Sequence, residues 1–198
     1  ITMRTQWLIA YAFTVCLIVL SAGSAMAFDE RDNPNALLKG KYRFSQNNTC
    51  AIVFDSIGFT SPPQLLTTGD GFTALLYLTG VAHYDGNGNY TLKDHGLFIS
   101  QLTPFPSGSS PVSTFADDCS GTYEVNPQNG SFIQKGSCTA TDGSYTLTGI
   151  KFEGQIGPEG SVLTMSSAEP VVQTLVGNGF ANKRICGAHV TSVRMHQK

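Results

Sequence analysis

Turn-forming residues recur along this chain about every ten to fifteen positions, and this spacing constrains the fold more than any other feature. The clearest signals are Asp85-Gly86-Asn87-Gly88, Asn126-Pro127-Gln128-Asn129-Gly130 and Gly157-Pro158-Glu159-Gly160. Between them, runs of alternating apolar and polar residues are typical of β-strands with one buried face. No long helical period interrupts the pattern; one turn is expected at Asn35–Leu38. The sequence therefore predicts an all-β protein, either a single antiparallel β-barrel of about 8–10 strands or a β-sandwich.

The expected strands share this alternation and are bounded by Gly, Pro, Asn or Asp. They are Gly40–Gln46, Cys50–Phe59, Phe72–Tyr84, Tyr90–Leu102, Cys119–Val125, Ser131–Thr141, Ser144–Gln155, Ser161–Ala168, Val171–Val176 and Phe180–Val193. Two longer loops are expected at Ser61–Gly71 and Pro104–Ser113.

The N-terminal segment has the pattern of a secretory signal. Arg4 is followed by an apolar run over Trp7–Leu20 and then by Ala25-Met26-Ala27, a small-x-small cleavage site. The alternative, a membrane span, would need about 20 apolar residues. We therefore expect a signal peptide over 1–27, a polar lead over 28–37 and a β-barrel domain over 38–198. The protein would be secreted or periplasmic, with no membrane span after cleavage.

Charge and motifs exclude several classes of partner. The formal net charge is −2, and no basic run is longer than Lys183-Arg184, so no nucleic-acid partner is expected. The sequence contains no phosphate loop, dinucleotide fingerprint or Gly-x-Ser-x-Gly elbow, so no cofactor is expected. The acidic turn at Asp85 begins like a calcium loop, but Tyr90 stands where that loop requires glycine. A hairpin turn without a metal is the better interpretation.

The first hairpin can be placed in register. Its apolar face contains Phe72, Ala74, Leu76, Leu78, Ala82 and Tyr84 on one strand and Tyr90, Leu92, Phe98 and Leu102 on the next. Both sets are even-numbered, so they share a face only if the connecting loop has an odd number of residues. A loop over Gly86–Gly88 satisfies this condition. It pairs Tyr84 with Tyr90 and Gly80 with Asp94.

Four cysteines remain after the signal, which in an exported chain indicates two disulfides. The alternatives are free thiols or zinc, but no two cysteines have the close spacing of a zinc knuckle. A hairpin loop over Pro127–Gly130 pairs Val125 with Phe132, and the same register places Cys119 opposite Cys138. By elimination Cys50 pairs with Cys186. This second bond joins the first strand to the last, as barrel closure requires.

Four short motifs occur in order along the chain: Lys39–Phe44, Tyr84–Asn89, Gly121–Asn126 and Ala181–Arg184. The series resembles uncharacterised exported bacterial proteins with a lipocalin-like (calycin) or allene-oxide-cyclase-like barrel. In calycins a Gly-x-Trp on the first strand packs beneath an arginine from the last strand. The resemblance therefore implies a contact between Tyr42, which replaces the Trp here, and Arg184.

Asp94 is the most informative acidic residue. The hairpin register points it inward, where a carboxylate must be paired, protonated or open to a cavity. The residue pattern nevertheless favours a bulge next to Gly96 that turns Asp94 outward. His83 and His95 fall on the opposite face and are expected to be exposed. Asp117 and Asp118 are expected in a solvated turn.

Three functions are compatible with these features. The first is a barrel that binds a small apolar or amphipathic ligand through Tyr42, Tyr84, Asp94, Phe98 and Arg184, with Gly80 and Gly96 leaving interior volume. The second is a cyclase or isomerase in which Asp94 or a tyrosine provides acid–base chemistry. The third is a structural or surface protein with a filled core, which would act through a strand edge or the two long loops.

Overall fold

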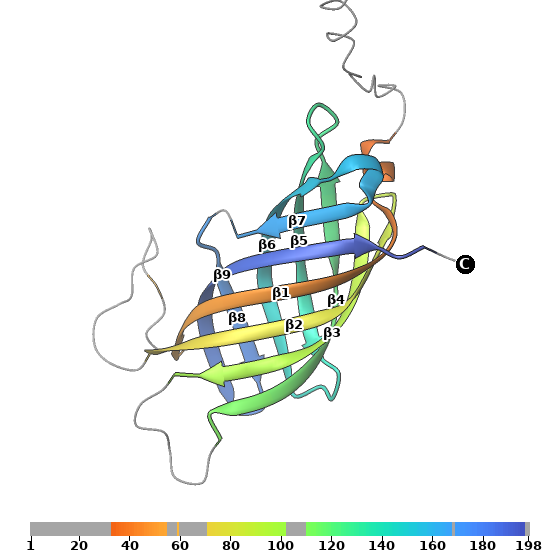
Figure 1. Cartoon of the computed structure of the whole chain (residues 1–198). Coiled ribbons are helices and arrows are strands. Elements are labelled where there is room, and N and C mark those ends of the chain that lie inside the picture. The colour runs from red at the N-terminus through yellow and green to blue at the C-terminus, as the bar shows by residue number, and fades with distance from the viewer. Residues whose placement is uncertain (1–32, 55–58, 60–70, 102–109, 168, 197–198) are drawn as a thin grey trace, which may run out of the picture. The chain divides into compact units, whose positions relative to one another are not determined.

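The computed structural model describes residues 33–54, 59, 71–101, 110–167 and 169–196, and these residues form a closed antiparallel β-barrel (Figure 1). The predicted all-β barrel is confirmed, and the sandwich is not formed. The expected signal peptide, residues 28–32 of the polar lead and most of both long loops lie outside the described residues. Within the described ranges, no helix has the length and apolar character needed to cross a membrane.

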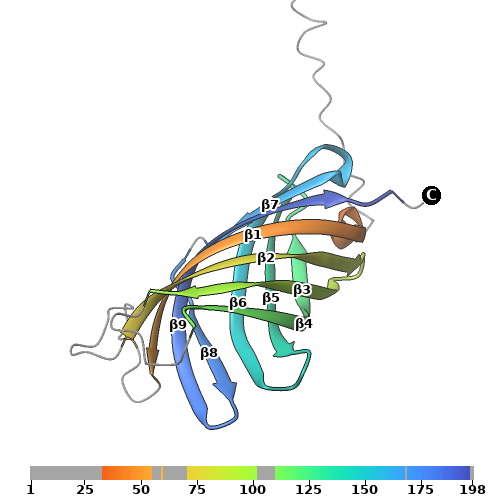
Figure 2. The same cartoon turned by 60° about the horizontal axis from the view of Figure 1, so that its bottom comes forward.

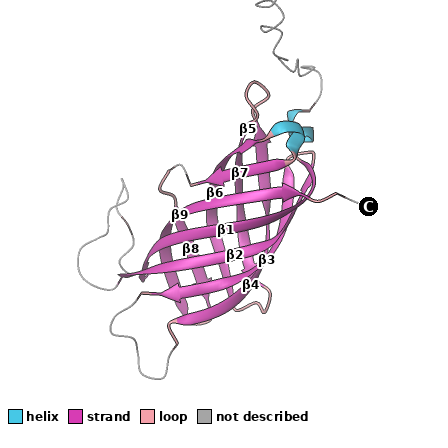
Figure 3. Cartoon of the chain, in the orientation of Figure 1, coloured by secondary structure: helices cyan, strands magenta, loops and turns pink. Residues whose placement is uncertain are grey.

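Strands account for most of the described chain, as Figure 3 shows. They are β1 (Lys39–Phe54), β2 (Gly71–Asp85), β3 (Asn89–Ser100), β4 (Val112–Val125), β5 (Ser131–Ala140), β6 (Tyr145–Ile156), β7 (Val162–Ser166), β8 (Val172–Gly177) and β9 (Phe180–Arg194). Two short 3-10 turns, η1 (Pro34–Leu37) and η2 (Pro158–Gly160), complete the fold.

The barrel closes because β1 pairs with both β2 and β9. Strands β7 and β8 share one position in the wall between β6 and β9 (Figure 2). The end of β6, at Glu153–Ile156, pairs with β7, whereas its start, at Tyr145–Thr148, pairs with β8. Eight wall positions are thus filled by nine strands, a number suited to an interior that holds side chains or one small ligand.

Both predicted hairpin registers are confirmed. Tyr84 pairs with Tyr90 and Gly80 with Asp94 across the Gly86–Gly88 loop. In that loop Asp85 accepts hydrogen bonds from the amides of Asn87 (2.6 Å) and Asn89 (3.0 Å), and Gly88 has φ 100°. These bonds use the Asp85 carboxylate to hold the turn, as expected of a hairpin turn.

Both predicted disulfides are also present. Cys119 is the register partner of Cys138, and Cys50 is the register partner of Cys186. The first bond joins adjacent strands of one hairpin. The second joins β1 to β9, so it fastens the seam where the sheet closes on itself.

Two strand assignments differ from those predicted by more than one or two residues. Gly40–Gln46 and Cys50–Phe59 were expected as separate strands, but β1 runs unbroken over Lys39–Phe54. Gln46 and Asn48 are polar although they point into the barrel. The middle of β1 therefore lacks the alternation of apolar and polar residues that marks a strand in the sequence. β4 begins at Val112 instead of Cys119, and Asp117 and Asp118 therefore lie inside a strand instead of a solvated turn.

Tyrosines fill one end of the barrel. The Tyr84 ring lies 5.5 Å from that of Tyr42, 5.2 Å from that of Tyr123 and 5.9 Å from that of Tyr90. We call these four residues the tyrosine cluster. The η1 turn is held at this end, because the amide of Val125 donates a hydrogen bond of 2.9 Å to Oδ1 of Asn35 in that turn. With this end packed solid, interior space lies toward the other end.

Candidate ligand-binding cavity

A cavity of about 290 Å³ occupies the barrel interior beyond the tyrosine cluster. Tyr90 lies at its inner end, and Phe98 and Phe115 line it from β3 and β4. Further apolar lining comes from Ile52, Phe72, Leu76, Leu78, Leu92, Leu147, Ile150, Phe152, Leu175 and Phe180. The volume is close to the lower limit for small-molecule pockets, about 300–1,000 Å³. The interior is therefore not a filled core.

Asp94 projects into this cavity from the middle of β3. It is 9% exposed, so the expected outward bulge is wrong: the strand keeps its regular register with Gly80, and the side chain stays on the inner face. Burial, followed by the nearby Asp117 carboxylate, raises the pKa of Asp94 to about 7, although an amide of Asp117 and the charge of Arg184 oppose this. Oδ1 of Asp94 is buried without a hydrogen-bond partner.

Asp117 stands beside Asp94 as its register partner on β4. Tyr145 donates a hydrogen bond of 2.6 Å to Oδ1 of Asp117. Burial is the main cause that raises the pKa of Asp117, while the bond from Tyr145 and the charge of Arg184 lower it. Of the two carboxylates, Asp117 is therefore the one with a strong hydrogen-bond donor, and Asp94 has the unpaired oxygen.

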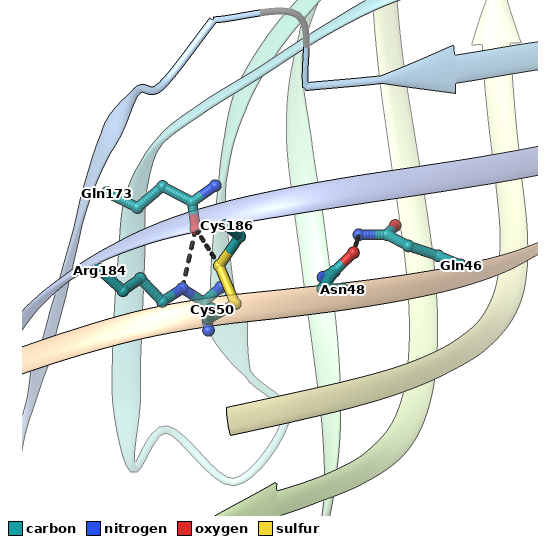
Figure 4. Close-up of a disulfide and its surroundings, with 6 residues drawn as sticks. All are labelled: Gln46, Asn48, Cys50, Gln173, Arg184 and Cys186. Atoms are coloured by element: carbon teal, nitrogen blue, oxygen red, sulfur yellow. Dashed lines mark hydrogen bonds between the residues drawn. A yellow bond between two sulfur atoms is a disulfide. The ribbon is translucent and has the colours of Figure 1, made fainter. Parts of the chain in front are cut away.

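Arg184 supplies the positive charge from β9. Its Nε donates a hydrogen bond of 2.8 Å to Oε1 of Gln173 on β8 (Figure 4). Burial lowers the pKa of Arg184 to about 10, and the nearby Tyr145, Asp117 and Asp94 counteract the shift. The guanidinium is thus cationic at neutral pH. Gln173 also packs 3.8 Å from the Cys186 sulfur, which has no proton to donate because it belongs to the disulfide.

Amide side chains extend the polar part of the lining. Gln46 donates a hydrogen bond of 2.8 Å to Oδ1 of Asn48, so these two β1 residues satisfy each other in part (Figure 4). Asn182 on β9 also lines the cavity, and its Oδ1 is buried without a partner. The charged side chains that line the cavity within the described residues are Asp94, Asp117 and Arg184.

The structure brings three of the predicted binding residues together. Asp94, Phe98 and Arg184 all line the cavity, whereas Tyr42 and Tyr84 belong to the tyrosine cluster and do not. Tyr84 is 1% exposed and donates a hydrogen bond of 2.7 Å to Oε1 of Gln134. Its hydroxyl is therefore directed toward a protein partner.

The expected contact between Tyr42 and Arg184 is wrong. Tyr42 pairs with Arg194, and Arg184 pairs with Ile52, about 33 Å further along β1. The Tyr42 hydroxyl instead donates a hydrogen bond of 2.8 Å to the carbonyl of Gly160. Arg194 bonds the carbonyl of Lys39 at the same end of the barrel, so the arginine that closes this end lies ten residues after the one expected.

Gly80 and Gly96 do not leave interior volume, contrary to expectation. A Cβ at Gly80 would lie 2.8 Å from the Phe44 ring and 2.1 Å from the carbonyl oxygen of Lys93. A Cβ at Gly96 would lie 2.9 Å from the Phe115 ring. The two glycines leave room for the neighbouring rings of Phe44 and Phe115. Neither glycine lines the cavity.

Several lining residues were missed by the sequence analysis: Asp117, Tyr145, Gln173 and Asn182. Tyr145, Gln173 and Asn182 reach the cavity from β6, β8 and β9, whose pairing depends on closure and has no local signal. His83 and His95 are exposed, as expected. No group of three or more His, Cys, Asp or Glu side chains in the described ranges is arranged to hold a metal ion.

Comparison with known protein families, with curated proteins and with solved structures found no match to this chain. The site is therefore interpreted from its geometry. An apolar cavity with a compact polar group at one wall suits a molecule that has an apolar body and a polar head. Two adjacent carboxyl groups, one with a pKa near neutrality, also suit proton transfer.

Proposed function

We propose that this protein binds a small amphipathic molecule inside its barrel. The observation that carries the proposal is the cavity of about 290 Å³, in which an apolar surface meets Asp94, Asp117 and Arg184. The apolar wall around Phe98 and Leu76 favours a hydrocarbon or aromatic body, because burial of apolar area drives its transfer from water. The polar groups favour one orientation of the ligand head.

The proposal includes a location outside the cytosol. Two disulfides, Cys50–Cys186 and Cys119–Cys138, suit an oxidising compartment. The signal expected over 1–27 leads to the same secreted or periplasmic location. A lipocalin-like relationship, in which a barrel carries a small hydrophobic ligand, stays part of the proposal and rests on the sequence resemblance alone.

Native mass spectrometry with a cavity-filling variant tests the proposal. Ala188 lines the cavity and is 2% exposed, so Ala188→Phe places a ring in the ligand's space. Ala51→Phe makes the same change at an exposed position on β1 and is the matched control. We expect 1-octanol to form a one-to-one complex with the natural protein and with Ala51→Phe but not with Ala188→Phe.

A second variant, Ser113→Phe, keeps the test valid if Ala188→Phe does not fold. Ser113 also lines the cavity but is exposed near the start of β4, where Ser113→Phe disturbs little packing. It is expected to weaken octanol binding while the circular dichroism spectrum is unchanged. Absence of any complex with the natural protein, or equal binding by all variants, would contradict a ligand site in the cavity.

The carboxyl pair favours a second candidate function, a general acid–base enzyme of the cyclase or isomerase kind. Asp94, with its pKa raised to about 7, has the proton affinity that such a catalyst needs near neutral pH. Tyr145 and Asp117 form a hydrogen-bonded donor–acceptor pair beside it. Turnover of a bound unsaturated ligand, detected by NMR and lost in Asp94→Asn while the ligand still binds, would identify an enzyme.

A further inference from the structure

An oxygen of Asp94 in the cavity lacks a hydrogen-bond donor, and this indicates which chemical group the ligand carries. Oδ1 of Asp94 is buried and accepts no hydrogen bond. A buried acceptor without a donor is unfavourable by about 1–3 kcal/mol, and more when it is charged. The same cavity contains a second such acceptor, Oδ1 of Asn182. A ligand that carries a hydrogen-bond donor would therefore complement this wall.

The charges that line the cavity are also unbalanced. Asp117 already has a donor in Tyr145, and Arg184 lies close enough to lower its pKa. Asp94 is the surplus carboxylate: Asp117 and Asp118 on β4 both raise its pKa, and Arg184 on β9 lowers it by less than burial raises it. Near neutral pH a bound proton relieves this surplus in part. A ligand cation would relieve it in place of the proton.

We propose that the natural ligand is a small cationic amphiphile whose ammonium group donates a hydrogen bond to Asp94 while its apolar body lies against Phe98 and Leu76. This inference rests on the proposed binding function and specifies its ligand. An anionic head would lie beside two carboxylates. Arg184, the cationic side chain among the described residues that line the cavity, already bonds Gln173 and interacts electrostatically with Asp117. The preference for an amine over an acid therefore follows from the lining.

Three probes with the same chain separate the possibilities: octylamine, 1-octanol and octanoate, titrated calorimetrically at pH 8. We expect octylamine to bind roughly ten- to hundredfold more tightly than 1-octanol, as a charge-assisted hydrogen bond allows, and octanoate to bind most weakly. Asp94→Asn should remove the advantage of the amine and leave 1-octanol binding within about twofold.

Glu124→Gln is the matched control. Glu124 is an exposed carboxylate on β4, seven residues after Asp117, and it does not line the cavity. This change should preserve the preference for octylamine. The natural protein gives an independent readout that needs no variant: at pH 7 octylamine should displace a proton from Asp94, detected as buffer-dependent binding enthalpy, whereas 1-octanol should not.

The outcomes are distinguishable. Octanoate binding as tightly as octylamine, or an amine preference that survives Asp94→Asn, would overturn the cationic head group but keep the binding function. Octylamine binding without proton displacement at pH 7 would also overturn it. If none of the three probes binds, the proposed binding function itself is overturned.

Discussion

Asp94 on β3 and Asp117 on β4 are register partners whose carboxyl groups both face the barrel interior. Cross-strand partners place their Cβ atoms about 4.5–5.5 Å apart. Two carboxylates at this separation and this degree of burial disfavour simultaneous ionisation. The pair therefore links the protonation of the cavity to the stability of the barrel.

The stability of the fold should fall as pH rises through the range in which Asp94 ionises. Its folded pKa is about 7, whereas the ordinary value is 3.8. Well below pH 3.8 the residue is protonated in both folded and unfolded states and contributes nothing. Above pH 7 it is ionised in both, and the buried charge destabilises the fold by an upper limit of about 4 kcal/mol. Asp94→Asn should therefore stabilise the protein more at pH 8 than at pH 4.5.

Urea denaturation of the natural protein and of Asp94→Asn at both pH values measures this difference. Glu124→Gln serves as the control, because it removes an exposed carboxylate from β4 that does not line the cavity, and it should change the free energy of unfolding by at most about 0.5 kcal/mol. A stabilisation by Asp94→Asn that is the same at pH 4.5 and pH 8 would be inconsistent with a raised pKa.

Removing the hydroxyl of Tyr145 should leave Asp117 without its donor. We expect Tyr145→Phe to destabilise the protein by about 1–3 kcal/mol, because a buried carboxylate oxygen then lacks its hydrogen bond. The loss should be larger at pH 8 than at pH 4.5, since the bond is strongest to the ionised form. Tyr77→Phe, at a position 46% exposed, is the control and should be nearly neutral in thermal denaturation.

The two disulfides should differ in their effect on stability. Chain-entropy arguments give about 3 kcal/mol for Cys119–Cys138, whose residues are 19 apart, and about 5 kcal/mol for Cys50–Cys186, whose residues are 136 apart. Paired Cys→Ser variants measured by denaturation should show this order. Non-reducing peptide mapping that linked Cys50 to Cys119 would refute both pairings.

A methyl group at Gly80 should strain the barrel wall. Its Cβ would lie 2.1 Å from the Lys93 carbonyl oxygen and 2.8 Å from the Phe44 ring, so Gly80→Ala should destabilise by about 1–3 kcal/mol. Gly187→Ala is the control, because its nearest neighbour is 4.0 Å away. Equal denaturation midpoints for the two variants would show that the wall around Gly80 yields easily.

Local patterns were sufficient for much of the fold. Turn chemistry gave the registers that pair Gly80 with Asp94 and Cys119 with Cys138, because short loops leave one register that keeps apolar faces together. The pairing of Asp94 with Asp117 could not be predicted from the sequence. It depends on how β3 meets β4 across the chain between Ser100 and Val112, which has no tight-turn signal.

Several of the remaining errors share a cause, because barrel closure depends on contacts between residues that are distant in sequence. Arg184 and Arg194 both lie on β9, and only the offset between β1 and β9 decides that Arg194 meets Tyr42. Tyr145 and Gln173 line the cavity from β6 and β8, whose pairing is also between segments distant in sequence. Polar interior residues such as Gln46 further obscured the alternation that marks a strand.

The most direct test of ligand binding inside the barrel is an NMR titration of the ¹⁵N-labelled protein with octylamine. A ligand inside the cavity predicts saturable shifts of the amides of Asp94, Asp117 and Arg184, with little change at Tyr42 in the closed end. Shifts restricted to outward-facing residues such as Lys93 or His95, or no saturable shifts at all, would contradict a barrel that binds its ligand in the interior.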